Sequence, residues 1–542
     1  MISSTLSILG DNIQSAALLP GVVPLEPPSA WYVRVTLLIA LGVISGLLLL
    51  IVIGWSRSAT RLQELFRDHL LPRIVPLTLL AVALTSFAVW QAGRITGPRA
   101  KRGNSPPPAA PPAAPPAPTT TPTTTATAAS GAATATVGAG KTPVADWTME
   151  RGGQQRLGIA PGAIGPQNDR RHWQRLQDDE AYYSSPTVIG DRLYAVASVG
   201  DRARILCLAA HTGQEIWNTA PADYRATFSS PVIADEQLFV GEGLHQTRRG
   251  RLVAVDLRAG AEGQIRWTFP TSGHIECTPT VAHGRVYFGA GDDGIYCLKI
   301  PTLPALPAAA AQTAAAKSSA RVPPSRSTPQ VVFHLPGAQF PDAETALAVH
   351  EGRLYVGLGV GGNALCVFHA DTGQLLERIA LPYPVFSPPA FDETHLYVGL
   401  GDANYASPAM RVPGQVIGVN QKTLAIDWTI DLPGAVLGAV AVDQEELFWA
   451  CGNGFIYRLN LRSRALDHYD TRAPLAASLA VTATTVFAAN QAGQLLALDR
   501  ATWKLQFEHS LGSPGNYVSS PTIFGRHLVI GTPNAGLICI GP

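Results

Sequence analysis

Six cysteines are the first residues that could support chemistry, and their spacing limits what that chemistry is. No two are adjacent and none belongs to a C-x-x-C-H sequence, so neither a vicinal disulfide nor a c-type haem is predicted. Cys207, Cys297 and Cys539 recur at one position of a repeated pattern, where Ala254 and Ala497 stand in other copies. Equivalent positions in separate copies are too far apart to bridge, so we expect buried free thiols. The full set, for which no disulfide framework is implied, is Cys207, Cys277, Cys297, Cys366, Cys451 and Cys539.

Two acidic motifs resemble metal-binding loops at first sight. Both Asp292-Asp293-Gly294 and Gly401-Asp402-Ala403-Asn404 fall where a strand-to-strand turn is expected, and Asp-Gly is a favoured turn pair. The histidines at 211, 274 and 283 are dispersed among turns and strand starts, without the spacing of a zinc site. We therefore predict no metal site and no catalytic residue.

One repeated unit supplies the elements that would position these residues. Ser184–Trp217 contains four short apolar runs separated by turns such as Gly190-Asp191, which predicts four antiparallel strands. The step from Pro186 to Pro231 is 45 residues, and four strands at that period indicate an all-β eight-bladed β-propeller. The further copies open at Ser229, Cys277, Thr345, Ser387, Leu437, Ala477 and Ser519. The Ser-Ser-Pro sequence at several openings resembles no nucleophile elbow and is expected to cap the inner strand.

The two ends of this repeat region complement each other. The last copy stops at Pro542, after its third strand, and a lone strand around Trp173 precedes the first copy. Trp173 precedes Ser184 by 11 residues, much as Trp217 precedes Ser229 by 12. We expect the N-terminal strand to complete the final blade and so remove an open sheet edge.

A sequence frame recurs around the third strand and the turn that follows it. Ala497, Asp499, Thr502 and Phe507 have counterparts at identical spacing in another copy, ending at Trp428. The frame, A-x-D-x-x-T-G-x-x-x-W, resembles the pyrroloquinoline-quinone (PQQ) repeat over about residues 147–542. Its aromatic position is expected to cover the seams between blades, at Trp173, Trp217, Trp267, Trp428 and Phe507.

The resemblance implies two kinds of protein, the quinoprotein alcohol dehydrogenases and the BamB-type lipoprotein of outer-membrane assembly. In the dehydrogenases PQQ stacks on an axial tryptophan, usually under an adjacent Cys-Cys disulfide, and a calcium bound by Glu, Asn and Asp polarises it. This sequence lacks the cysteine pair, and most of its tryptophans occupy the seam position. We therefore expect no enzyme and no cofactor, with PQQ-dependent catalysis as the alternative and the cofactor-binding residues unknown.

The N-terminal region is predicted to hold the chain at a membrane. After a short segment, 1–30, the region 31–95 contains two uncharged runs that predict transmembrane helices at about 32–54 and 74–92. The second run is shorter and contains proline, which leaves a re-entrant or interfacial helix as its alternative. Residues 96–145 are rich in Pro, Ala and Thr and predict a disordered linker to the propeller, 146–542, which has a second low-complexity insert at 301–329.

Charge excludes one class of partner and leaves the membrane orientation open. The formal net charge is +1 and only 15% of residues are charged, so nucleic-acid binding is not expected. Arginines flank both predicted spans, and the resemblance alone places the propeller on the extracytoplasmic, periplasmic side of the cell membrane. We predict a membrane-anchored scaffold in the cell envelope whose protein partner is unknown. A small-ligand sensor that uses the propeller axis is a further alternative.

Overall fold

The computed structural model describes residues 158–160, 162–177, 179–303, 328–403 and 412–542. The chain divides into two compact units, Met1–Ala132 and Ala133–Pro542, and every described residue belongs to the second. In the described ranges, no helix has the length and apolar character needed to cross a bilayer. The predicted spans at 32–54 and 74–92 lie outside these ranges, as do the linker and most of the 301–329 insert.

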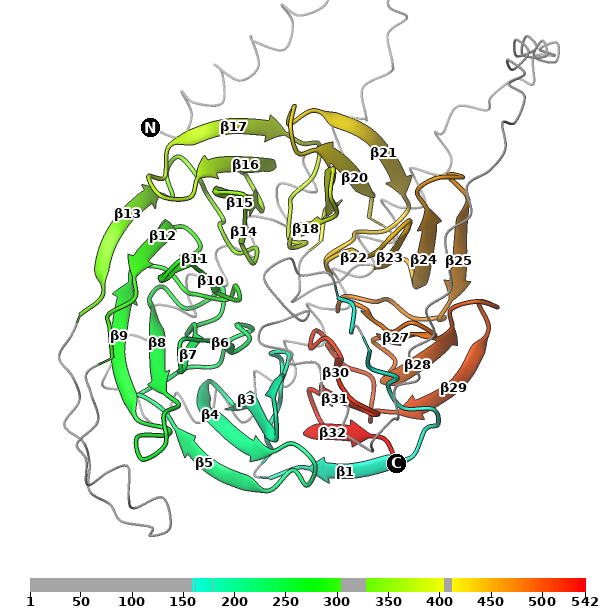
Figure 1. The fold of residues 1–542 in the computed structure, drawn as a ribbon, viewed down its shortest axis with the longest axis horizontal. Helices are drawn as coiled ribbons and strands as arrows, with labels where there is room; N and C mark the ends of the chain where they lie inside the picture. Colours follow the sequence, from blue (N-terminus) through cyan, green and yellow to red (C-terminus); the bar gives the residue numbers. More distant parts are fainter. Residues whose placement is uncertain (1–157, 161, 178, 304–327, 404–411) are drawn as a thin grey trace, which may run out of the picture. The chain divides into compact units, whose positions relative to one another are not determined.

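Eight four-stranded antiparallel sheets form a ring, so the predicted all-β eight-bladed propeller is confirmed (Figure 1). Blades 1 to 4, from inner to outer strand, comprise β2 (Thr187–Ile189), β3 (Arg192–Val199), β4 (Arg202–Ala209) and β5 (Glu215–Thr219); β6 (Val232–Ala234), β7 (Gln237–Val240), β8 (Gly250–Asp256) and β9 (Ile265–Thr271); β10 (Thr280–Ala282), β11 (Arg285–Gly289), β12 (Gly294–Lys299) and β13 (Gln330–Pro336); and β14 (Ala348–His350), β15 (Arg353–Leu358), β16 (Ala364–His369) and β17 (Leu375–Ala380).

Blades 5 to 8 repeat this arrangement, and the last blade takes its outer strand from the start of the propeller. They comprise β18 (Ala390–Phe391), β19 (His395–Gly401), β20 (Gly414–Asn420) and β21 (Ile426–Leu432); β22 (Ala441–Asp443), β23 (Glu446–Ala450), β24 (Phe455–Asn460) and β25 (Leu466–Asp470); β26 (Ala480–Val481), β27 (Thr485–Ala489), β28 (Gln494–Asp499) and β29 (Leu505–Ser510); and β30 (Thr522–Phe524), β31 (His527–Gly531), β32 (Leu537–Ile540) and β1 (Arg171–Arg175).

Burial follows from the blade geometry. The second and third strands are apolar and buried on both faces because each blade is covered by its two neighbours, whereas the outer strands alternate half-buried and exposed side chains. The antiparallel connections put the segments that lead into the inner strands, and the loops between second and third strands, on one face of the ring. We call this the loop face.

The ring closes where β1 pairs antiparallel with β32, as the sequence predicts. Trp173 lies opposite Cys539, and its indole Nε1 donates to the Ala210 carbonyl of blade 1 at 3.0 Å. Arg175 is buried and pairs with Glu215 of β5 at 2.8 Å. Strand β1 is therefore part of blade 8 through its backbone hydrogen bonds to β32, and its side chains contact blade 1.

Hydroxyl groups at the blade openings link the inner strands around the axis. The second serine of each Ser-Ser-Pro accepts a backbone N–H from the preceding blade: Ser185 N donates to Ser230 Oγ at 2.9 Å, and Ser520 N donates to Ser185 Oγ at 2.9 Å. The first serine binds at its own second strand in two of these blades, where Ser519 Oγ accepts from Gly531 N at 3.1 Å and Ser229 Oγ accepts from Gly241 N at 2.9 Å, whereas Ser184 Oγ has no partner among the described residues. These serines satisfy backbone donors in the buried centre of the ring and have a structural role.

The outer-strand aromatics lie at the seams between blades. Trp173 and Trp217 pack on the turn of the next blade, where a Cβ added at Gly213 or Gly263 would come within 2.7 Å or 3.0 Å of the indole. Phe333 of β13, which sequence analysis did not select, contacts Gly373 in the same way. Glycine is required in these turns because an aromatic ring occupies the space of its side chain.

Of the other three aromatics predicted at seams, Trp428 contacts a residue of the next blade, whereas the ring contacts of Trp267 and Phe507 lie within their own blades. Trp267 is buried on β9, with its ring centroid 5.8 Å from that of Phe239. Trp428 on β21 lies beneath the guanidinium of Arg464, 5.1 Å from the ring centroid. Phe507 on β29 is 6.3 Å from Phe487 of its own blade.

Candidate functional site

The residues at one position of the repeat surround the propeller axis. Each blade contributes the residue four positions before its inner strand, and we call these eight residues the axial ring. Six are apolar or aromatic and belong to one cluster, whereas the other two are glutamates in the neighbouring blades 3 and 4. The axial ring consists of Tyr183, Phe228, Glu276, Glu344, Phe386, Leu437, Ala476 and Val518. The cavity at its centre is small, about 50 Å³.

A larger depression opens beside the two glutamates on the loop face. Its volume is about 360 Å³, within the range of small-molecule and peptide-anchor pockets. Its apolar side is formed by Val360, which is 62% exposed, with Phe386 and Leu244. Its polar side holds carboxylates and one imidazole, and no lysine or arginine is found among the described residues that line it. The polar members are His245, Gln246, Glu276, Asp292, Asp342 and Glu344.

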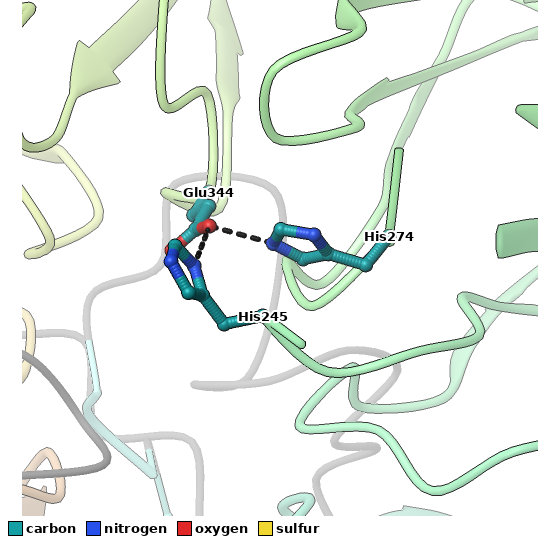
Figure 2. Close-up of side chains that lie close together, drawn as sticks. All are labelled: His245, His274 and Glu344. Carbon is teal, nitrogen blue, oxygen red and sulfur yellow. Dashed lines mark hydrogen bonds and ion pairs between the residues drawn. The ribbon is translucent and has the colours of Figure 1, made fainter. Parts of the chain in front are cut away.

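Three side chains from three separate segments meet at the edge of this depression (Figure 2). His245 lies in the loop between β7 and β8, His274 precedes β10, and Glu344 precedes β14. Nε2 of His274 and Nδ1 of His245 lie 2.6 Å and 2.8 Å from the same oxygen, Oε1 of Glu344. The three donor atoms lie within 4.8 Å of one another. His274 and Glu344 are buried, with side chains 7% and 8% exposed, whereas His245 is 69% exposed.

Burial and mutual repulsion divide the carboxylates into two kinds. Burial raises the pKa of Glu276 well above its usual value, and the charge of Glu344 raises it further. The same two causes raise the pKa of Asp342 to about 7. For Glu344 burial acts in the same direction, but hydrogen bonds from His274 and His245 outweigh it and hold the pKa below its usual value. Glu344 is therefore the anionic centre of the group.

Oε1 of Glu276 is buried and has no hydrogen-bond partner among the described residues. A buried carboxylate oxygen without a partner is costly, and such atoms are concentrated where a ligand, an ion or water completes the site. Because Glu276 lines both the central cavity and the depression, it links the two spaces.

Two glycines leave room for the His274 side chain. Gly291 has φ +53°, and a Cβ there would lie 2.7 Å from Cε1 of the His274 ring. Gly243 has φ +103°, and its Cβ would lie 3.0 Å from Cβ of His274. Both positions need glycine for the left-handed backbone and for the close approach of the imidazole.

Sequence reasoning missed this group. It places His274 among the dispersed histidines and does not select His245, Glu344 or Glu276, because none has metal-like spacing along the chain. His211 and His283 lie elsewhere, at the turn after β4 and the turn after β10. None of the five predicted seam aromatics is among the residues that line the depression or the central cavity. The available signal was the axial-ring position, where two blades carry glutamate and six carry apolar residues.

The described lining residues do not fit PQQ. The central cavity of about 50 Å³ is smaller than a fused tricyclic quinone requires, and neither it nor the depression is lined by a tryptophan. PQQ carries several carboxylates, which the acidic groups of the depression would repel. All six cysteines are free and buried, so no disulfide caps the axis.

Comparisons with known proteins agree on the fold. A family model described as outer membrane protein assembly factor BamB matches residues 201–303 and 409–540. BamB from Moraxella catarrhalis is 12% identical with a TM-score of 0.51, covering 68% of this chain and 98% of that one. The quinohemoprotein alcohol dehydrogenase from Comamonas testosteroni is 11% identical with a TM-score of 0.53, covering 73% and 80%. The computationally designed protein Ika8 is 13% identical with a TM-score of 0.51, covering 69% and 100%.

At these identities the structural likenesses concern the fold alone, and no curated protein sequence matches the chain. The solved relatives include both a catalyst and an assembly factor, so the fold does not select between them. The recurring A-x-D-x-x-T-G-x-x-x-W frame, the eight blades and the family model that matches residues 201–303 and 409–540 together support a β-propeller built from PQQ-type repeats.

Proposed function

We propose that this chain is a non-catalytic binding platform of the cell envelope. In this proposal the segments at 32–54 and 74–92 anchor it in the membrane, and the propeller binds a protein partner on the extracytoplasmic side. The family model that matches the repeats describes an assembly factor, which supports a scaffold of this kind. The partner would dock over the depression on the loop face.

The observation that carries the proposal is the mixed lining of the depression. Val360, which is 62% exposed, and the buried ring of Phe386 line the same depression as the carboxylates, with no lysine or arginine among the described lining residues. A segment that inserts an apolar side chain and a neighbouring basic side chain would complement this surface. Rigid propellers suit this task because their loops vary while the blades hold them in place.

The chemistry of the axis argues against a PQQ dehydrogenase. Such an enzyme would need space for the quinone and groups that complement its carboxylates. The central cavity is small, and the adjoining side chains Glu276 and Glu344 are acidic. The proposal therefore assigns no catalytic residue and no cofactor.

Site-specific photo-crosslinking tests the docking surface. A photoreactive phenylalanine analogue placed at Val360 in the full-length, membrane-inserted chain should capture a single protein, because this side chain would face the partner. The matched control is Leu505 on the outer strand β29, which is 40% exposed and lies away from the axis. Val360→Glu should abolish co-purification of the same protein, whereas Leu505→Glu should not.

Two results would contradict the proposal. One is capture of the same proteins from both positions, which would mean that the depression has no special role. The other is dye-coupled alcohol oxidation by the purified chain after addition of PQQ and calcium, which would assign catalysis to the axis.

A further inference from the structure

We propose that His245, His274 and Glu344 form a binding site for a divalent transition-metal ion of the zinc type. The inference concerns the chain alone and does not depend on the proposed protein partner. Three donor atoms already converge within 4.8 Å, and they come from three segments that the packing of consecutive blades 2 to 4 brings together (Figure 2).

The donor types select the class of metal. Two imidazole nitrogens and one carboxylate oxygen suit zinc and its neighbours in the first transition row, whereas calcium and magnesium prefer oxygen ligands throughout. Zinc lies about 2.0–2.2 Å from such ligands, which places tetrahedral ligand atoms about 3.3 Å apart. The His245–Glu344 contact at 2.8 Å would therefore open by roughly half an ångström, which the exposed His245 allows, and the His274–Glu344 contact at 2.6 Å would open by a similar or slightly larger amount through a small shift of these two side chains.

The present hydrogen bonds are also those expected of a site prepared for a cation. One oxygen of Glu344, Oε1, faces an imidazole nitrogen from each of the two histidines. A metal ion binds only an unprotonated imidazole nitrogen, so the proton that each facing nitrogen now donates to Oε1 would move to the other ring nitrogen or to solvent. The ion would then join the two nitrogen lone pairs and the carboxylate oxygen.

Charge around the cluster favours a cation. The depression is lined by Glu276, Asp292 and Asp342 in addition to Glu344, and the described lining contains no lysine or arginine to balance them. A divalent ion would relieve the repulsion among these carboxylates. This excess of carboxylates is a reason to expect uptake of an ion rather than only a hydrogen-bonded core histidine.

Three protein ligands leave one coordination position open. Zinc sites with two histidines and one carboxylate keep this position for water or an incoming ligand. Because two of the three ligands, His245 and Glu344, line the depression, the open position is available to a donor group that enters it. The buried, unpartnered oxygen of Glu276, which lines the same depression, is a candidate within the chain to bind such a water.

Metal titration of the full-length, detergent-solubilised protein tests the site, after removal of adventitious metal with a chelator. Zinc should bind one ion per chain, and cobalt should give visible absorption bands of a four- or five-coordinate site. His245→Gln should weaken zinc binding at least about tenfold. Since His245 is 69% exposed, this variant should retain the fold. Glu344→Gln should weaken binding at least as much.

The matched control is His395→Gln, which removes a histidine paired with Asp427 at 2.9 Å on blade 5, where a single imidazole meets the carboxylate. Excess zinc should raise the unfolding temperature of the wild type and of this control but not of His245→Gln. Failure of the wild-type chain to bind zinc would overturn the proposal. Equal zinc affinity in His245→Gln and the wild type would overturn it, as would a site that binds calcium and rejects zinc.

Discussion

At the scale of single residues, the position of His274 depends on what its neighbours lack. Gly243 and Gly291 contribute no side chain, and the imidazole occupies the space that a Cβ at either position would need. The imidazole of His274 is enclosed by its neighbours, and the side chain is only 7% exposed. A methyl group at one of the glycines would displace the ring and with it one of the three proposed ligands.

Gly291→Ala should therefore impair the site more than the fold. Gly190 provides a matched control because it has the same φ, +53°, but a Cβ added there would meet no atom within 4 Å. Both alanine variants should lose about 1–2 kcal/mol of unfolding free energy from left-handed backbone strain. Only Gly291→Ala should also weaken zinc binding, at least about tenfold. Equal zinc affinity in the two variants would show that the glycine does not position His274.

Arg464 illustrates a second type of seam between blades, in which the turn position holds a residue other than glycine. It occupies the left-handed turn position, with φ +61°, at which glycine stands in several other blades, and its guanidinium stacks on Trp428. At the next seam the roles are reversed, since Trp503 takes the turn position with φ +59° and stacks on Arg458, 4.7 Å away. At both seams a cation–π contact replaces the packing of an aromatic ring against a glycine of the turn.

The substitutions Arg464→Gly and Arg464→Ala separate the two contributions of this residue. Each loses the cation–π contact, worth about 0.5–1 kcal/mol at an exposed site. Only the glycine variant also relieves the left-handed backbone strain, so it should be more stable than the alanine variant by about 1 kcal/mol. Denaturant unfolding of the two proteins gives the comparison. An alanine variant as stable as the glycine variant would mean that the turn is not strained.

At the scale of elements, the blades can be predicted from the sequence because their signals are local, whereas the cluster of His245, His274 and Glu344 cannot, because its members lie far apart in the chain. Each blade is specified by local signals that recur from copy to copy: Pro186 is followed by Pro231 after 45 residues, and the aromatic Trp217 by Trp267 after 50. The cluster is assembled across blades: His274 and His245 precede Glu344 by 70 and 99 residues. Sequence spacing carries no information about such neighbours, because the packing of one blade on the next creates them.

Alignment of the repeats at their inner strands would have recovered part of this information. Glutamate at position 276 or 344 replaces the apolar residue that the other blades place on the axis. Residues that conform to the repeat are explained by the fold. A residue that departs from the repeat is therefore a candidate for a role in function. His245 leaves no such trace, since the loop between β7 and β8 has no counterpart of equal length in the neighbouring blade 3.

At the scale of the whole molecule, three histidines meet where the ring closes. His172 belongs to β1, His211 to the turn after β4, and His527 to β31. The ring centroid of His527 lies 4.7 Å from that of His172 and 5.2 Å from that of His211. Its Nε2 has no hydrogen-bond partner among the described residues. Protonation of His527 would place a charge on a half-buried imidazole whose Nε2 has no partner among the described residues, at the seam that joins the two ends of the propeller.

The stability of the closed ring should therefore depend on pH through His527. Burial, followed by the charges of His172 and His211, lowers its pKa from 6.5 to about 4. Because the unfolded chain binds this proton more readily, its stabilising contribution is complete above pH 6.5 and is lost as the pH falls toward 4. The side chain is partly exposed, so we expect a loss of about 1–2 kcal/mol, less than the full shift would give.

The substitution His527→Phe removes the titrating group and keeps the ring, which stacks on Phe524 with centroids 5.2 Å apart. Between pH 6.5 and 4, the unfolding temperature of this variant should fall less steeply than that of the wild type. His468→Phe, at an exposed histidine on β25, should leave the wild-type slope unchanged. If His527→Phe and the wild type lose stability in parallel, the acid sensitivity lies elsewhere, and the closure seam is not where protonation acts.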